Sequence, residues 1–163
     1  MKPRIFTVAQ ANRQIPRVQK AISRLEEWQP RLLEGRERLK EMAVLQADEE
    51  GPVDHREGIR LSHEVEMAEH EILSALREIE EIGCVLKQGG LVDFFTVKDG
   101  ILYELCWHSG EEEIRFYHEV NSGFDYRKPL TSEDIATMGV GFAKGSGVTS
   151  RGPALSGAEG SRV

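Results

Sequence analysis

The sequence has few cysteines and no long apolar run. Only two of its 163 residues are cysteines, Cys84 and Cys106, too few for the disulfide framework of a small secreted domain, so we expect both to be free thiols. No run of about eighteen apolar residues predicts a transmembrane helix. The opening segment MKPRIFTVAQ also lacks the apolar stretch of a secretory signal. We therefore expect a cytoplasmic protein that makes no contact with a membrane.

Familiar catalytic motifs are missing as well. The sequence contains no glycine-rich phosphate loop, no G-x-S-x-G nucleophile motif, no C-x-x-C pair and no internal repeat. Its 39% apolar and 30% charged residues are the composition of an ordinary globular domain. No cofactor is indicated, and these absences leave open whether the protein is an enzyme.

The sequence has fewer basic than acidic residues, and the basic residues are unevenly distributed. The net charge is −7; residues 1–46 hold ten Lys and Arg against five Asp and Glu, whereas residues 47–131 hold eight against twenty. If the two segments pack together, the basic one is neutralised internally and leaves little positive field for a nucleic-acid backbone. The charge pattern therefore argues against nucleic-acid binding.

Two long helices are predicted by apolar residues that recur every three or four positions. Thr7 and Gln10 are spaced as a capping box at the start of the first helix. Pro16 and Pro30 lie inside that helix, and we expect them to divide it into segments. The first stripe consists of Val8, Ala11, Ile15, Val18, Ile22, Leu25, Leu32, Leu39 and Ala43, and the second of Leu61, Val65, Ala68, Ile72, Ala75, Ile79, Ile82 and Leu86.

The two helices are expected to form an antiparallel, coiled-coil-like hairpin over residues 7–87. Residues 47–58 contain a Gly-Pro pair and several charges, which predict the tip of the hairpin. The acidic residues Glu64, Glu71 and Glu78 on the second helix have two interpretations: they pair with arginines of the first helix, or they form a solvated face.

After residue 90 the apolar period changes to two, which predicts strands at 91–97, 101–108 and 113–120. Asp99-Gly100 between the first two strands is a strong hairpin signal. A three-stranded meander over 91–120 is too small to be stable alone, so the helical hairpin should cover one face. We expect a single α+β domain over residues 1–131, followed by a disordered tail over 132–163 that is rich in Gly, Ser and Ala.

The segment ELCWHSGEEEIRFYHEV at 104–120 holds one cysteine, one tryptophan, two histidines and five glutamates. A four-residue loop over 109–112 would place Leu105 opposite Phe116. On that register Cys106 and His118 point to opposite faces of the sheet, and a Cys-His metal pair requires a longer loop or a bulge. The predicted core face carries Tyr103, Leu105, Trp107, Ile114, Phe116 and His118, and the polar face Glu104, Cys106, His108, Glu113, Arg115 and Tyr117.

Five polar residues are candidates for a site. Asp93 lies in an apolar run, and a buried carboxylate needs a partner, for which His118 and Arg127 are the candidates; the three form either a polar network that stabilises the fold or an acid–base site. Cys106 is either an inert half-buried thiol or a thiol activated by Arg115. The catalytic candidates are Asp93, His118, Arg127 and Cys106, and the metal-ligand candidates are His118, Asp93 and Glu111.

Three ordered segments carry a family resemblance: RIFTVAQANRQIPRVQ at 4–19, EIEEIGCVLKQGGLVDF at 78–94 and LCWHSGEEEIRFYHEVNSGFDYR at 105–127. Together they resemble the prokaryotic family called domain of unknown function 2203, over roughly residues 4–130. The resemblance implies that Asp93, Cys106, Glu111, His118 and Arg127 belong to a shared polar pattern, and it implies no particular activity. His108 and Tyr117 depart from the pattern, which has a basic residue and a tryptophan at these positions.

Two functions are compatible with these observations. The leading hypothesis is a non-enzymatic binding or scaffolding module that forms a homodimer or holds a protein partner through its helical hairpin, because Leu73 and Leu76 widen the apolar stripe of the second helix beyond what one partner helix requires. The alternative is a small-molecule-binding or metal-binding protein, or an enzyme, with a site around Asp93, Glu111, His118 and Arg127.

Overall fold

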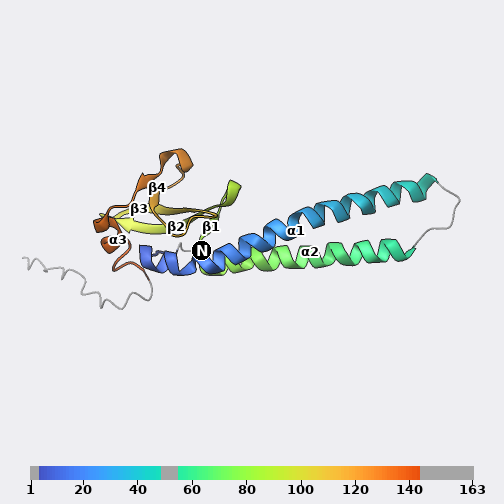
Figure 1. The fold of residues 1–163 in the computed structure, drawn as a ribbon, viewed down its shortest axis with the longest axis horizontal. Helices are drawn as coiled ribbons and strands as arrows, with labels where there is room; N and C mark the ends of the chain where they lie inside the picture. Colours follow the sequence, from blue (N-terminus) through green and yellow to red (C-terminus); the bar gives the residue numbers. More distant parts are fainter. Residues whose placement is uncertain (1–3, 49–54, 144–163) are drawn as a thin grey trace, which may run out of the picture.

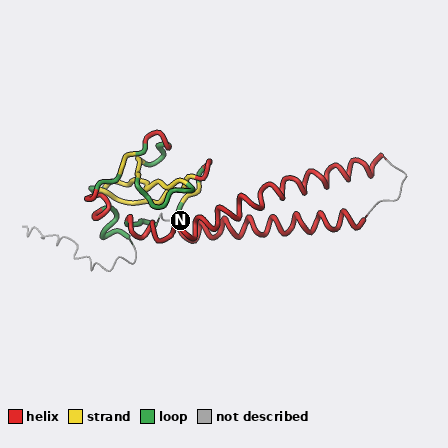
Figure 2. Tube along the Cα trace, in the orientation of Figure 1, coloured by secondary structure: helices red, strands yellow, loops and turns green. Residues whose placement is uncertain are grey.

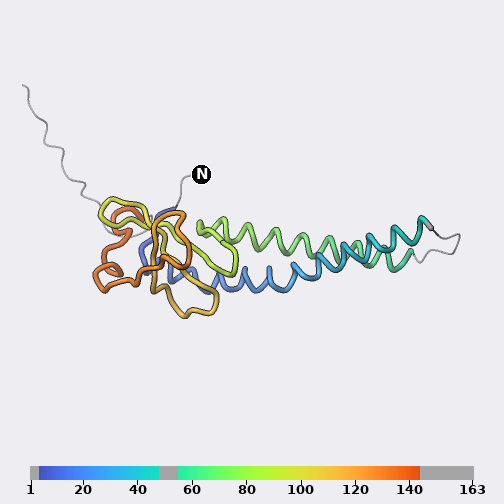
Figure 3. The backbone as a smooth tube through the Cα atoms, turned by 90° about the horizontal axis from the view of Figure 1, so that it is seen from above, coloured from blue at the N-terminus to red at the C-terminus, as the bar shows by residue number. Residues whose placement is uncertain are grey.

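Two long helices pack against one face of an antiparallel sheet in the computed structural model, which describes residues 4–48 and 55–143. Helix α1 (Val8–Asp48) and helix α2 (His55–Ile82) run antiparallel and side by side in both views of the chain (Figures 1 and 3). The sheet lies against one end of this pair, and the rest of the pair projects away from it as an arm (Figure 2). At about 1.5 Å per residue α1 is roughly 60 Å long.

The sheet has five strands in the order β1-β2-β3-β4-β5, two more than predicted. The predicted strands correspond to β2 (Leu91–Lys98), β3 (Ile101–His108) and β4 (Phe116–Glu119). The two additional strands, β1 (Val85–Leu86) and β5 (Lys128–Pro129), have two residues each, too few to produce a period. Two 3₁₀ turns, η1 (Gln88–Gly90) and η2 (Phe124–Tyr126), precede β2 and β5.

Asp99 and Gly100 form the turn between β2 and β3, as predicted. Lys98 pairs with Ile101, and the two residues between them have φ angles of 50° and 75°. Two consecutive positive φ values belong to the tight hairpin turn that Asp-Gly favours.

The core lies between the sheet and the part of the hairpin nearest to it. Val92, Phe94, Leu105 and Trp107 are on the helix-facing side of the sheet and have exposed fractions of 1% or less. The predicted apolar stripes supply the other side of the core, from Val8 to Leu25 on α1 and from Ala75 to Ile82 on α2. The hairpin is therefore confirmed, and the sheet is packed on one of its ends.

The predicted capping box of α1 is confirmed, and the predicted pairing of acidic residues of α2 with arginines of α1 is confirmed in part. Thr7 and Gln10 form the predicted capping box, each side chain accepting a hydrogen bond from the other's backbone N–H at 3.1 Å. Glu71 pairs with Arg24, and Glu78 pairs with Arg17. Glu64 instead pairs with Arg60 of its own helix.

Two predictions are wrong, one about breaks in α1 and one about disorder after residue 131. Helix α1 is continuous through Pro16 and Pro30, so neither proline divides it. The predicted disorder from residue 132 does not hold for residues 132–143, because α3 (Ser132–Thr137) follows β5 and Met138 is fully buried in the core. The rest of the predicted tail lies outside the described residues.

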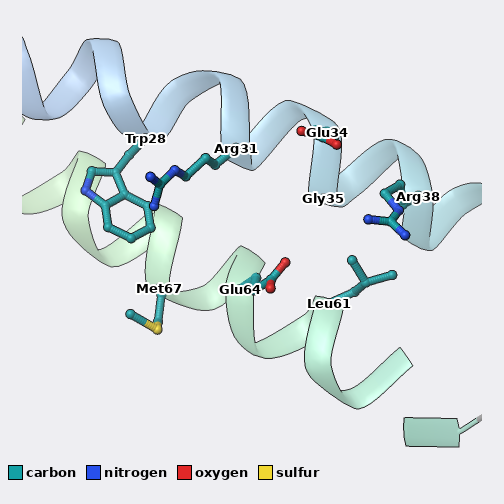
Figure 4. Close-up of a pocket in the computed structure, with 8 residues that line it drawn as sticks. All are labelled: Trp28, Arg31, Glu34, Gly35, Arg38, Leu61, Glu64 and Met67. Carbon is teal, nitrogen blue, oxygen red and sulfur yellow. The ribbon is translucent and has the colours of Figure 1, made fainter. Parts of the chain in front are cut away.

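At Gly35 the two helices approach closely enough to exclude a side chain. A Cβ atom at Gly35 would lie 2.8 Å from Cγ2 of Val65. A cleft of about 410 Å³ lies beside this point, with Trp28 and Gly35 on α1 and Leu61 and Met67 on α2 (Figure 4). Among the described residues, no helix combines the length and apolarity needed to cross a membrane.

Candidate functional site

The second hairpin of the sheet has a different register from the predicted one. Leu105 lies opposite Tyr117, and Cys106 lies opposite Phe116, a shift of one residue. The connection is longer than four residues because Glu111 folds back into it: its carboxylate accepts a hydrogen bond from the N–H of His108 at 2.8 Å, and its carbonyl accepts one from Nε1 of Trp107 at 2.9 Å. A shift of one residue moves every side chain of β4 to the opposite face.

The consequence is that Cys106 and His118 share a face of the sheet, which corrects the prediction that they point apart. His118 pairs with Glu104, and Cys106 pairs with Asp93 on its other side. Directly paired residues of antiparallel strands project to the same face. Phe116 and His118 thus leave the helix-facing core, and Tyr117, which is 8% exposed, takes their place in it.

Asp93, Cys106 and His118 converge on the face of the sheet opposite the helices. One ligand-type atom from each of the three side chains lies within 4.8 Å of the other two. The exposed fractions of the three residues are 1%, 1% and 2%. A carboxylate, a thiol and an imidazole are thus held together out of solvent by three adjacent strands, β2, β3 and β4.

The ring of His118 is oriented by its own strand. Nδ1 is 2.8 Å from the carbonyl oxygen of Glu119, and because a carbonyl oxygen only accepts, Nδ1 carries a hydrogen. Nε2 is 3.2 Å from Oδ1 of Asp93. In the neutral ring with hydrogen on Nδ1, a lone pair of Nε2 would face a carboxylate oxygen, so the pair requires a proton or a metal cation between the two atoms.

Lys87 and Glu104 complete the charged surroundings of the cluster. The ammonium of Lys87 contacts Oδ2 of Asp93 and lies 3.2 Å from Oε2 of Glu104. Burial by itself lowers the pKa of Lys87, but the contacts with Asp93 and Glu104 outweigh it and raise that pKa. The carboxyl groups of Asp93 and Glu104 thus face a single ammonium group, and this surplus of acidic groups favours the binding of a cation.

The thiol of Cys106 is not an activated nucleophile in this setting. Burial raises its pKa to about 12, and the carboxylate of Asp93 adds to the effect. Arg115, the predicted activating residue, is exposed and pairs with Glu113. The thiol therefore stays protonated at neutral pH unless a metal ion displaces its hydrogen.

Arg127 and Glu111 form a second unit beside the cluster. Nη2 of Arg127 lies 2.8 and 2.9 Å from the two carboxylate oxygens of Glu111. The guanidinium stacks on Phe116 and Phe124, with its Cζ 4.1 and 4.8 Å from the two ring centroids. Arg127 thus pairs with Glu111 and not with Asp93, and Glu111, a predicted metal ligand, is engaged in holding the loop and Arg127.

Two charged residues beside the cluster, Glu104 and Lys87, were absent from the predicted site. Glu104 is on the same face as Cys106 by simple alternation along β3, a signal that was present in the sequence. Lys87 is brought to Asp93 by the pairing of Val85 with Asp93. A two-residue strand gives no period, so no pattern placed Lys87 at the site.

Comparison with known proteins gives one family. No curated protein and no solved structure matches the chain. The family model described as "Uncharacterized conserved protein (DUF2203)" matches residues 4–130, a span that contains every residue of the cluster. The chain therefore belongs to the DUF2203 family.

Proposed function

We propose that the protein binds a divalent transition-metal ion, zinc above all, between Asp93, Cys106 and His118. The observation that carries the proposal is the convergence of these three ligand-type atoms within 4.8 Å in a buried site. Ligands of a tetrahedral zinc ion are about 3.3–3.8 Å apart, so the longest separation would have to shorten by roughly 1 Å.

The donor atoms match the preferences of zinc. Oxygen, sulfur and nitrogen from Asp, Cys and His are the usual zinc ligands. Oδ1 of Asp93 is available to an ion because Lys87 contacts the other oxygen. The bond from Nδ1 of His118 to the carbonyl of Glu119 is the outer contact that fixes a metal-binding histidine.

Charge balance supports the same proposal. A divalent ion would be neutralised by the carboxylate of Asp93 and the thiolate of Cys106. Lys87 and Glu104 beside it neutralise each other. Three protein ligands leave a fourth position for water or a small ligand, the arrangement that catalytic zinc sites use.

The test is metal content per chain, measured by elemental mass spectrometry on untagged protein before and after chelation, followed by cobalt reconstitution. We expect near-stoichiometric zinc and, with cobalt, a thiolate charge-transfer band in the near ultraviolet. Cys106→Ser should abolish the band, and Cys84→Ser, which alters the other buried thiol, should leave it intact.

The competing interpretation is a polar network that only stabilises the fold. If the His118→Ala and Asp93→Ala variants lose thermal stability while the parent protein binds neither zinc nor cobalt, the metal proposal fails and the network interpretation stands. For a bound ion, by contrast, a free concentration of 100 Kd would stabilise the protein by about 2.7 kcal/mol.

The helical hairpin favours a second candidate function, a binding or scaffolding module. Leu73 and Leu76 on α2 are 53% and 42% exposed, although both belong to the helix that packs on α1. Charged substitutions at both positions should leave the fold intact and abolish capture of a partner or self-association, measured by light scattering. A monomer that tolerates both substitutions without any loss would contradict this candidate.

A further inference from the structure

The exposed apolar residues of α1 are confined to its distal part. Among the described residues, the large apolar side chains of α1 with high exposure are Leu33 at 67%, Val44 at 57% and Leu45 at 61%. All three lie beyond Pro30. The proximal part of the same helix buries its apolar residues in the core, so this outer surface has no function in the packing of the monomer.

Four residues of this surface form a pattern whose order of apolar and charged positions is unchanged when the direction of the helix is reversed. Leu33, Glu37, Lys40 and Val44 are spaced four, three and four apart, so they form one stripe on a helix. From each end the order is apolar, charged, charged, apolar, and the acidic and basic positions exchange when the stripe is reversed. Gly35, which faces α2, lies about 140–180° around the helix from the residues of this stripe.

We propose that the stripe is a docking surface for α1 of a second copy of this chain, aligned antiparallel about a two-fold axis between positions 38 and 39. In that register Leu33 meets Val44 of the other copy, and Glu37 meets Lys40, each contact occurring twice. An isologous interface has this reciprocal form, in which each residue contacts a complementary residue of its symmetry mate. A pattern that is complementary to its own reverse selects an identical antiparallel partner.

The charged residues of the stripe are available for this contact. No hydrogen bond or ion pair joins Glu37 or Lys40 to another residue within the described part of the chain. Elsewhere on the arm, Arg36 pairs with Glu69 and Arg38 with Glu57. A shallow hollow lies at the same place, lined by Glu37, Lys40, Glu41, Val44 and Leu45.

The expected dimer is weak because one stripe of one helix is a small interface. Exposed charge pairs contribute little affinity, but they set orientation and partner choice, as flanking charges do in coiled coils. This inference is independent of the metal site. It rests on the second candidate function, because both assign the hairpin to association, and it names a different surface from Leu73 and Leu76.

The test exchanges the charges and measures the dimer constant by sedimentation equilibrium. Lys40→Glu places Glu37 opposite a glutamate, and Glu37→Lys places a lysine opposite Lys40, so each variant should dimerise at least tenfold more weakly than the parent. The double exchange Glu37→Lys/Lys40→Glu should dimerise like the parent. An equimolar mixture of the two single variants should form a heterodimer, because both contacts are then attractive.

Lys20→Glu is the control for Lys40→Glu, because it changes the net charge by the same amount at an exposed position of α1 outside the stripe. It should dimerise like the parent. Unchanged thermal unfolding by circular dichroism would show that every variant folds. A parent dimer that survives Lys40→Glu but is lost when Leu73 and Leu76 are charged would overturn this inference and keep the second candidate; a parent that stays monomeric at all concentrations would overturn self-association at either surface.

Discussion

Residue 139 joins the N-terminal segment and the end of the described chain to the sheet. Gly139 has a φ of 74°, and a Cβ atom there would lie 2.1 Å from the carbonyl oxygen of Phe6. Its N–H donates to the carbonyl of Val97 at 2.8 Å. Only glycine satisfies both the positive φ and the close approach.

Gly139→Ala should therefore destabilise the fold by about 2–4 kcal/mol, since it combines the cost of a left-handed alanine with displacement of Phe6. Gly141→Ala is the matched control: its φ is 85°, but nothing lies within 4 Å of the added Cβ, so only about 1 kcal/mol should be lost. Urea unfolding of both variants measures the difference. Equal losses of unfolding free energy in the two variants would mean that the contact of the added Cβ with Phe6 does not contribute to the destabilisation.

At the level of elements, a half-buried ion pair joins α3 to β2. Nζ of Lys98 is 2.8 Å from Oδ1 of Asp134, which is 3% exposed as a residue. The same carboxylate closes the capping box of α3 with Thr131. The pKa of Asp134 is lowered, most by its hydrogen bond with Lys98 and next by the backbone N–H of Thr131. The pKa of Lys98 is raised, most by its hydrogen bond with Asp134 and next by the one with Tyr117.

The sign of the resulting pH dependence follows from these directions. A depressed carboxyl pKa contributes stability above the ordinary value of 3.8, and this contribution is lost as the pH falls through the lower folded value. Asp134→Asn should thus be less stable than the parent at pH 7, and the difference should shrink as the pH is lowered below about 3.8. Glu133→Gln, in the same helical turn, should show no such trend. A difference that stays constant down to acid denaturation would refute the ion pair's role.

The elements also show how far the sequence determines the fold. The periods of the helices and of β2 and β3 predicted those elements, because burial of one face repeats over many residues. The need of the buried Asp93 for a partner was predicted with two candidates, His118 and Arg127, and Asp93 lies beside His118 and Lys87. The register of β4 was missed by one residue because it depends on the side chain of Glu111 inside the loop, a contact that no local pattern encodes. That single residue decided whether Cys106 and His118 share a face.

For the whole molecule, the structure separates a core from an arm. The core cluster contains no residue of α1 after Leu25 and none of α2 before Ala75. A chain in which residues 36–64 are replaced by a short glycine-containing turn, joined where Gly35 approaches Val65, should therefore keep the sheet, the cluster and any bound metal. It should lose the self-association that depends on the stripe of Glu37, Lys40 and Val44. Circular dichroism, metal analysis and sedimentation test these outcomes, and an insoluble or unfolded product would show that the arm is required for folding.

The outer edge of β2 is covered by three segments that are distant in the sequence. Lys87, Phe6 and Gly139 donate their backbone N–H groups to the carbonyls of Leu91, Phe95 and Val97, each at 2.8 Å, and β1 pairs at Asp93 between the first two. An uncovered strand edge is a template on which other chains polymerise. We therefore expect residues 131–143 to shield this edge from pairing with other chains, and a fragment trimmed to residues 4–130 to expose the carbonyl of Val97 at an open strand edge.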